Sequence, residues 1–188
     1  MKSMTPELCT ERLRLRPVEL ADAEQVQPLF GQWEVVKYLN TRVPWPYPAD
    51  GALTFFRDVA LPAIERGDAW HWTLRLRSVP ETVIGAISLM RNPDENRGFW
   101  LAPQWRGQGL MLEAADAVTD FWFRELKFPV MRIPKAAVNE ASRRISLAQG
   151  MKVVKTFESD YVGGRWETEL WELTSEEWFR HKAKTSTT

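Results

Sequence analysis

The feature that most constrains this chain is a glycine-containing segment, residues 104–109 (QWRGQG), between an apolar run and a helical pattern. The apolar run is 99–101 (FWL), and the helical pattern begins at Leu110. The order therefore indicates a strand, a turn and a helix. The first N–H groups of a helix lack partners and carry partial positive charge, and glycines let a bulky anion reach the main chain. The segment thus predicts a phosphate site, to which Arg106 would add a full charge.

Two well-known phosphate loops do not fit this segment. A Walker A loop continues from its last glycine with Lys and then Ser or Thr, whereas Leu110 and Met111 follow Gly109 here. A dinucleotide-binding loop needs the spacing Gly-x-Gly-x-x-Gly, and only Gly107 and Gly109 are present. An ordinary strand-to-helix turn stays open as the alternative at this point.

Composition is typical of a soluble globular protein, with 44% apolar and 27% charged residues in 188. Lys plus Arg equals Asp plus Glu at 25 each, so bulk charge favours neither nucleic acid nor a membrane surface as a partner. The N-terminus has no apolar leader, and no apolar run reaches membrane-spanning length. The single cysteine excludes a disulfide framework within the chain and is compatible with a reducing compartment. We therefore expect one cytoplasmic domain over residues 1–188.

Hydrophobic periodicity predicts a chain of mixed helices and strands. Alternating apolar residues predict strands at 12–17, 70–76, 83–90, 97–101, 130–136, 152–158 and 165–173. Helical spacing predicts helices at 21–30, 33–39, 49–66, 110–125, 139–149 and 175–181. We expect a core of about 10–173, a terminal helix at 174–181, a loose lead-in at 1–10 and disorder at 182–188.

The stretch 40–48 holds three prolines, which exclude a helix or a regular strand. Its aromatic residues, Trp45 and Tyr47, either fasten the loop to the core or form a wall of a substrate cleft. The sequence leaves these two interpretations open.

Neither histidine nor cysteine chemistry is indicated. His71 lies in a predicted strand with no second His, Cys or carboxylate at ligand spacing, so we expect a structural side chain and no metal site. Cys9 has no neighbouring base that would make it a nucleophile.

The order of predicted elements over about 10–173 resembles the GNAT N-acetyltransferase fold, and most of all its RimJ/RimL-like branch, the ribosomal-protein N-terminal acetyltransferases. The segments that carry the resemblance are 104–109, 10–16 (TERLRLR), 44–47 (PWPY) and 139–144 (NEASRR) followed by Gly150. The resemblance implies a single GNAT-type α/β (α+β) domain. It also implies a mixed, mostly antiparallel central sheet of about seven strands, flanked by helices.

The same resemblance implies that an acetyl group passes from acetyl-CoA to a primary amine, a protein N-terminus or a small molecule, without a covalent enzyme intermediate. No metal is implied, and relatives occur as monomers and homodimers. The implied cofactor-binding residues are Phe99, Trp100, Leu101, Gln104, Arg106, Gly107, Gln108, Gly109, Leu110, Asn139 and Ser142. The N–H groups of 107–110 would hold the diphosphate, and the edge of 99–101 would pair with the pantetheine amides. Trp45, Tyr47 and Tyr161 would border the acceptor.

The chemistry requires a base and an acid. An amine attacks a thioester only when neutral, and the leaving thiolate needs a proton. The resemblance points to Ser142 as the acid, although a serine at a helix start can instead cap its own helix. Ser146 is a second candidate for the acid. Glu158 is the candidate base, with a solvated carboxylate at a strand end as the alternative. Glu95 and Glu140 are weaker options.

Two departures from the family pattern favour a different class of function. Met111 stands where the family usually has a small residue, and Asn96 stands where family strands often have Glu before x-Gly. The alternative is therefore a CoA-binding module that has lost catalysis and acts as a sensor or by protein contact. A longer acyl-CoA as donor is a third hypothesis.

Overall fold

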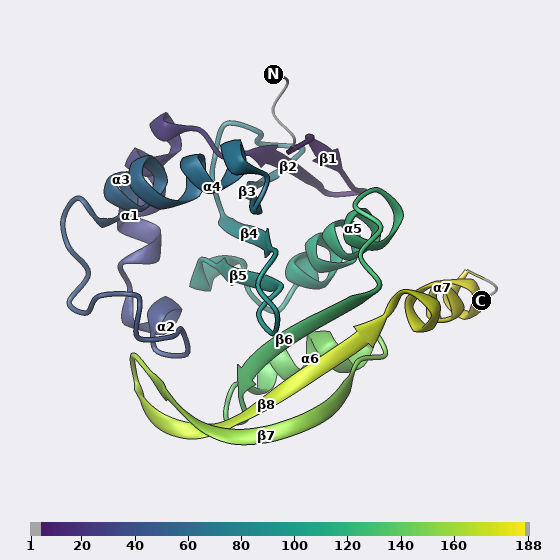
Figure 1. Cartoon of the computed structure of the whole chain (residues 1–188). Helices are drawn as coiled ribbons and strands as arrows, with labels where there is room; N and C mark the ends of the chain where they lie inside the picture. The colour runs from purple at the N-terminus through teal and green to yellow at the C-terminus, as the bar shows by residue number, and fades with distance from the viewer. Residues whose placement is uncertain (1–4, 187–188) are drawn as a thin grey trace.

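Hydrogen bonding divides the strands into two antiparallel sheets that lie next to each other (Figure 1). The computed structural model describes residues 5–186. The five-stranded sheet has the order β1-β2-β3-β4-β5, and the three-stranded sheet has the order β6-β8-β7. The predicted α/β class is confirmed, and hydrogen bonding divides the strands into two sheets where the family resemblance implied one central sheet.

The five-stranded sheet is built from β1 (Leu8–Cys9), β2 (Leu13–Pro17), β3 (Ala69–Leu76), β4 (Gly85–Met90) and β5 (Arg97–Leu101). Strand β1 corrects the expected loose lead-in, because Leu8 pairs with Leu15 and packs against the core. A strand of two residues is too short to show the alternation by which strands are recognised in a sequence.

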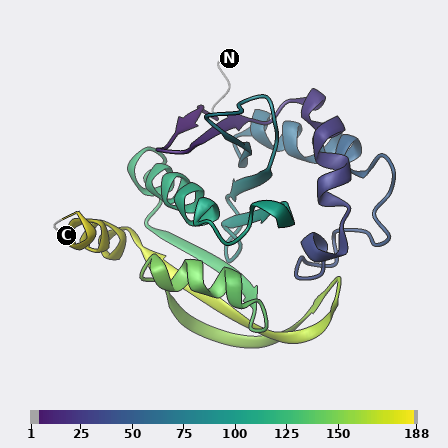
Figure 2. The same ribbon diagram turned by 180° about the vertical axis from the view of Figure 1, so that it is seen from behind.

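The three-stranded sheet is built from β6 (Val130–Ala136), β7 (Lys152–Tyr161) and β8 (Gly164–Thr174). Strand β7 runs past the predicted end at Glu158, up to the hairpin turn. Figure 2 shows α6 (Glu140–Ala148) lying across one face of this sheet.

The two sheets meet where β5 and β6 begin to diverge. The N–H of Asn96 donates to the carbonyl of Arg132 at 2.8 Å. The side-chain Oδ1 of Asn96 accepts from the N–H of Arg132 at 2.7 Å. Within residues 5–186, no ladder continues this pairing between β5 and β6. The facing edges of the two strands are therefore left without main-chain partners from each other.

The remaining helices are α1 (Ala23–Phe30), α2 (Trp33–Val36), α3 (Gly51–Phe55), α4 (Leu61–Arg66), α5 (Leu110–Arg124) and α7 (Ser175–Thr185). The predicted helix 49–66 is interrupted by a π-helical turn at Phe56–Ala60. Pro62 follows that turn in the first positions of α4. A proline has no N–H to donate and is tolerated at the start of a helix, which explains this arrangement.

Helix α7 corrects the expected disorder at 182–188, because it continues to Thr185. Thr174 and Glu177 form a reciprocal capping box at its start. Near its end, Lys182 lies over the ring of Trp178 at 5.3 Å from the ring centroid. Residues 187–188 lie outside the described residues.

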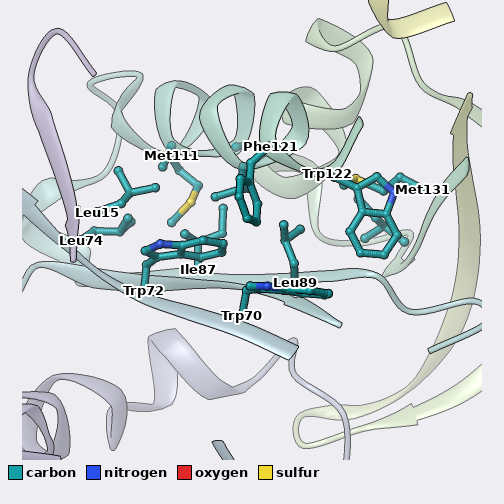
Figure 3. Close-up of a cluster of buried hydrophobic side chains, with 14 of the residues drawn as sticks. Leu15, Trp70, Trp72, Leu74, Ile87, Leu89, Met111, Phe121, Trp122 and Met131 are labelled. Atoms are coloured by element: carbon teal, nitrogen blue, oxygen red, sulfur yellow. The ribbon is translucent and has the colours of Figure 1, made fainter. Parts of the chain in front are cut away.

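The five-stranded sheet is covered by α5 on one face and by α1, α3 and α4 on the other (Figure 1). Figure 3 shows Trp72 and Ile87 beneath α5, with Phe121 of that helix above them. The ring centroids of Trp72 and Phe121 are 5.7 Å apart. Successive side chains of β5 point to opposite faces of the sheet. Phe99 and Leu101 pack in the hydrophobic cluster under α5, and Trp100 packs in the cluster under α1, α3 and α4. In the described part of the chain, no helix is long and apolar enough to cross a lipid bilayer.

Candidate active site

The glycine segment forms an open loop between β5 and the start of α5. Gly107 and Gly109 have φ angles of 77° and 76°, a left-handed conformation that favours glycine. Gly109 is also the N-cap of α5. A Cβ atom added to Gly107 would meet no atom within 4 Å, so this side of the loop is open.

The loop has the donors that an anion needs. Among the described residues, no acceptor bonds to the N–H groups of Gly107, Gln108 or Gly109. These groups join the unpaired donors of the first turn of α5. Unpaired donors around two glycines at a helix N-terminus fit a diphosphate. Gln104 precedes the loop as part of a short 3-10 turn, Pro103–Trp105, and is exposed.

Arg106 is turned back onto the protein. Its Nε donates to the carbonyl of Leu101 at 3.1 Å, and its Nη2 donates to the carbonyl of Glu34 at 2.9 Å. The guanidinium therefore ties the loop to β5 and α2. Its contact with a phosphate stays a prediction.

Arg12, for which the sequence analysis predicted no role at the site, brings positive charge to the loop. Its Nη1 donates to the carbonyl of Gln108 at 2.8 Å, and its Nε pairs with Glu113 at 2.7 Å. Its Nη2 lies 3.5 Å from the place that a Cβ on Gly109 would occupy. The Arg12 side chain is 45% exposed, so the guanidinium is accessible on the same side as the loop.

Glu113, in the first turn of α5, holds Arg12 in this position. Its Oε1 accepts from the Arg12 N–H at 2.8 Å and also from the Thr10 hydroxyl. Partial burial raises the pKa of Glu113, but the hydrogen bonds from Thr10 and Arg12 outweigh burial and lower this pKa below its usual 4.5. The sequence shows that Glu113 is an acid in the first turn of a predicted helix, but it does not show that Arg12 is its partner.

Ser142 and Asn139 lie together at the start of α6, but their roles differ. Asn139 is the N-cap, and its Oδ1 accepts from the N–H of Ser142 at 3.3 Å. The Ser142 hydroxyl instead accepts from Nζ of Lys135 at 2.5 Å. Asn139 thus does the capping that was one interpretation of Ser142, which leaves the serine hydroxyl to Lys135.

Lys135 is a site residue that sequence reasoning missed. It lies on β6, is 5% exposed, and its Nζ is 5.2 Å from the ring centroid of Phe99 on β5. Burial and the positive charge of Arg97 lower the pKa of Lys135 well below its usual 10.5. Its burial could have been predicted from the alternation of the strand, because Lys135 shares a face with the apolar residues Met131 and Ile133.

Ser146 is fully buried, and its hydroxyl bonds to no other described residue. Arg97, at the start of β5, is buried as well. Its Nη1 donates to Thr119 at 2.8 Å and to Gln149 at 2.7 Å, while its Nε and Nη2 have no partner within residues 5–186. Buried polar atoms without partners are available to a polar ligand or to water.

Glu158 lies apart from these groups. It is exposed on the edge strand β7, directly opposite Glu167, while its neighbour Phe157 is opposite Thr168. Directly opposite residues share a face of a sheet, and successive residues alternate between faces. Tyr161 bonds to Thr168 through its hydroxyl at 2.7 Å, so Glu158 and Tyr161 lie on opposite faces. A role of Glu158 as base stays a prediction.

The tip of the β7–β8 hairpin is fastened to the segment after α2, and both views place it there (Figures 1 and 2). The N–H of Val162 donates to Leu39 at 2.9 Å, and the N–H of Gly163 donates to Lys37 at 2.9 Å. The ring of Tyr161 lies against Trp166, with 5.7 Å between the ring centroids. This junction forms an aromatic corner at the predicted acceptor side.

Glu95 and Glu140, the weaker candidates for the base, are both paired. Both carboxylate oxygens of Glu95 accept from Arg42 at 2.6 Å. Glu140 is exposed at the start of α6 and pairs with Arg144 at 3.5 Å. Neither carboxylate contacts Ser142 in the part of the chain that is described.

The two aromatic residues of the proline-rich loop differ in role. The Tyr47 ring packs on Phe30 at 5.0 Å, and a Cβ on Gly51 would lie 2.6 Å from the Tyr47 ring. Tyr47 therefore fastens the loop to α1 and α3. Trp45 is 43% exposed and contacts Trp33 at 5.4 Å. Its place beside an acceptor stays a prediction.

His71 makes contacts of a structural kind. Its Nδ1 is 2.6 Å from the Ser88 hydroxyl on β4, and its ring meets Phe55. Over residues 5–186, no cluster of three or more His, Cys, Asp or Glu residues has the arrangement of a metal site.

Comparison with known proteins gives a family and a set of similar folds. The sequence model of one family, the acetyltransferase (GNAT) domain, matches residues 12–152. No curated protein sequence matches the chain significantly.

Three solved structures illustrate the similarity of fold. The ribosomal L7/L12 alpha-N-protein acetyltransferase RimL, in complex with coenzyme A, is 16% identical with a TM-score of 0.77, covering 92% of this chain and 99% of that chain. The ribosomal-protein-S5-alanine acetyltransferase from Vibrio fischeri is 17% identical with a TM-score of 0.77, covering 92% and 98%. RimJ from Mycobacterium smegmatis, in complex with CoA-disulfide, is 18% identical with a TM-score of 0.73, covering 88% and 83%.

Proposed function

The chain belongs to the GNAT acetyltransferase family, and on that premise we propose that it transfers the acetyl group of acetyl-CoA to a primary amine. The observation that carries the proposal is the loop between β5 and α5. It has two glycines at positive φ, an open outer side and unpaired N–H groups at a helix N-terminus. This combination suits a diphosphate, such as the one in CoA.

The N–H groups of residues 107–110 bind the diphosphate in this proposal, with Arg12 as an added positive charge. The edge of β5 that faces β6 orients the pantetheine arm through main-chain hydrogen bonds, as a peptide strand would bind there. Phe99 to Leu101 are the residues of that edge, and Asn139 borders the arm from α6. Bound acetyl-CoA supplies the thioester, whose carbonyl carbon the amine attacks.

Three protein groups take part in the proposed mechanism, as oxyanion donor, acid and base. A main-chain N–H near Trp100 and Leu101 donates to the developing oxyanion. The Ser142 hydroxyl gives its proton to the departing sulfur, with Ser146 as the second candidate. Glu158 is proposed as the base on family resemblance alone, acting on the acceptor through water. No covalent enzyme intermediate is needed, because the amine itself is the nucleophile.

The acceptor is a primary amine, either a protein N-terminus or a small molecule. Two of the similar structures are described as acetyltransferases of ribosomal proteins, which supports a protein N-terminus. Tyr161 and Trp45 are proposed to border this acceptor, whereas Tyr47 packs on α1 and α3 and so supports the loop that carries Trp45. The exposed, free Cys9 is compatible with a cytoplasmic protein, which we propose to be a monomer or a homodimer.

The experiment measures thiol release from acetyl-CoA by the purified chain. The acceptors are a peptide mixture with free N-termini, polyamines and aminoglycosides. We expect release above the rate without acceptor for at least one of these classes. No release above that background with all three would contradict amine acetylation.

A second candidate function is a CoA-binding module without catalysis. It is favoured because the residues near the start of β5 that could supply a catalytic base are used otherwise. The position where the family often has an acid holds Asn96, which bonds to Arg132 at the sheet junction, and the carboxylate of Glu95 pairs with Arg42. Calorimetric titration with CoA and acetyl-CoA, next to the release assay, separates the two functions. Binding without turnover on any acceptor would support the module.

A further inference from the structure

Lys135 and Ser142 form a buried pair in which the amine has no acidic partner. Nζ of Lys135 donates to Ser142 Oγ at 2.5 Å. Within residues 5–186, no carboxylate forms an ion pair with Lys135. Its directly opposite neighbour on β8 is Glu169, which pairs instead with Arg143 at 2.8 Å. The hydrogen bond to the Ser142 hydroxyl therefore fixes the position of the Lys135 amine.

The charges around Lys135 come from four elements, β5, β8, α6 and α5. Arg97 of β5 lies over the same Phe99 ring as Lys135, at 5.8 Å from the centroid. On β8 and α6, the charges of Glu169 and Arg143 are paired with each other. On α5, Asp116 accepts from Gln149, which in turn binds Arg97. Burial and the positive charge of Arg97 therefore both disfavour the ammonium form of Lys135, which lowers its pKa.

A purely structural role fits this pair poorly. Asn139 already caps α6, so the Ser142 hydroxyl is not needed for capping. Burying an amine without a carboxylate costs stability unless other bonds compensate. An ammonium whose pKa is lowered from 10.5, by contrast, is a better proton donor near neutral pH than an ordinary lysine.

We propose that Lys135 is a positioning residue that supplies the proton which Ser142 delivers to the leaving sulfur. The inference rests on the proposed function. As the C–S bond of the thioester breaks, the bonding pair goes to sulfur, and the Ser142 O–H proton moves to sulfur to give the thiol. At the same time an Nζ–H proton of Lys135 moves to Ser142 Oγ. Lys135 ends as a neutral amine, which takes a proton back from solvent.

The first test compares Lys135→Met, Ser142→Ala and the double variant, with Lys155→Met as a control that removes an exposed lysine from β7. The substrate is the amine that the parent protein acetylates fastest. We expect Lys135→Met to lower kcat about 10-fold or more, a part of the roughly 100- to 10,000-fold that general acid–base catalysis contributes, and to leave KM for acetyl-CoA within about twofold. Because Lys135 acts through Ser142, the double variant should be no slower than Ser142→Ala.

The pH profile separates proton supply from mere packing. The relay needs the ammonium form, so kcat of the parent should fall as pH rises through the pKa of Lys135. Lys135→Met should lack this alkaline fall, and Lys155→Met should keep it. A parent and a Lys135→Met variant with the same kcat and the same profile would overturn the relay but leave the proposed function standing.

A readout without turnover completes the test. The 13Cε signal of Lys135, assigned by its loss in Lys135→Met, should titrate in the free protein well below pH 10.5. Titration at or above that value would overturn the relay. So would an acetyl group found on Lys135 after a single turnover, since an acetylated amine cannot relay protons. If the parent releases no thiol with any acceptor, the proposed function fails, and the relay fails with it.

Discussion

His71 is the residue whose surroundings give the clearest dependence on pH. It lies on β3, within the five-stranded sheet, between Ser88 of β4 and the Phe55 ring of α3. Burial lowers the pKa of His71 from 6.5 to about 4. The folded protein therefore resists a proton that the unfolded chain accepts.

We expect stability to fall as pH decreases through the window from 6.5 to about 4, where the unfolded chain binds more protons at His71. The contribution of His71 is fully present above pH 6.5, and its loss amounts to about 3 kcal/mol at most. His71→Asn should remove this part of the pH dependence. The measurement is urea unfolding at pH 7 and pH 4, with His181→Asn as the control. Equal losses in His71→Asn and the parent would contradict the prediction.

The place of a single residue was predictable where it follows from the local sequence pattern around that residue. Asn139 and Ser142 were placed at a helix start by spacing, and the structure has them there. Lys135 and Arg12 were not found, because their importance comes from contacts with Ser142 and Gln108. Such contacts join distant parts of the chain and have no local pattern.

At the scale of elements, the loop between β5 and α5 supports the most direct prediction. Gly107→Glu would place a bulky, negatively charged side chain on the open side of the loop. Losing charge-assisted hydrogen bonds at about 1.5–3 kcal/mol each should weaken CoA binding about 100-fold or more. The measurement is calorimetric CoA affinity, with circular dichroism to verify the fold.

Two further variants serve as controls for the loop. Gly107→Ala imposes a similar backbone strain at φ 77° but adds only a methyl group, so its affinity should stay much closer to that of the parent. Arg106→Ala should affect CoA affinity less than Gly107→Glu, because the guanidinium bonds to Leu101 and Glu34. A folded Gly107→Glu variant with the affinity of the parent would refute the phosphate loop.

Most elements were predictable because their apolar periodicity is long enough to read. Helix α5 and strands β3 to β6 lie within two residues of their predicted bounds. Strand β1 and the end of α7 were missed for different reasons. The first is too short for a pattern, and the second gains its last turn from tertiary contacts such as the ion pair of Lys182 with Asp116 of α5 at 3.8 Å.

At the scale of the whole molecule, Asn96 joins the two sheets. Its side chain accepts from Arg132 at 2.7 Å and donates to the carbonyls of Met90 at 3.1 Å and Asn92 at 2.5 Å. Its amide thus has a structural use where the family pattern often has an acid. The separation into two sheets could not be read from the sequence, because strand periodicity does not say which strand pairs with which.

We expect Asn96→Ala to destabilise the protein by about 2 kcal/mol or more, since it removes three hydrogen bonds to partly buried main-chain groups. For a chain of this length, about 2 kcal/mol corresponds to a fall in Tm of roughly 4–8 °C. Asn92→Ala is the matched control, because its side chain is exposed and makes no hydrogen bond within the described residues. The measurement is thermal unfolding, and equal Tm values for the two variants would contradict the role of Asn96.

The division into two sheets also follows the order in which the chain is synthesised. The five-stranded sheet ends at Leu101, and the three-stranded sheet begins at Val130, with α5 between them. The first sheet can therefore complete its ladder, and α5 can cover it, while the second sheet is still being translated. Lys135, Ser142 and the Asn96–Arg132 junction all require residues after 130. A nascent chain thus carries the glycine loop first and acquires the Lys135–Ser142 pair only afterwards.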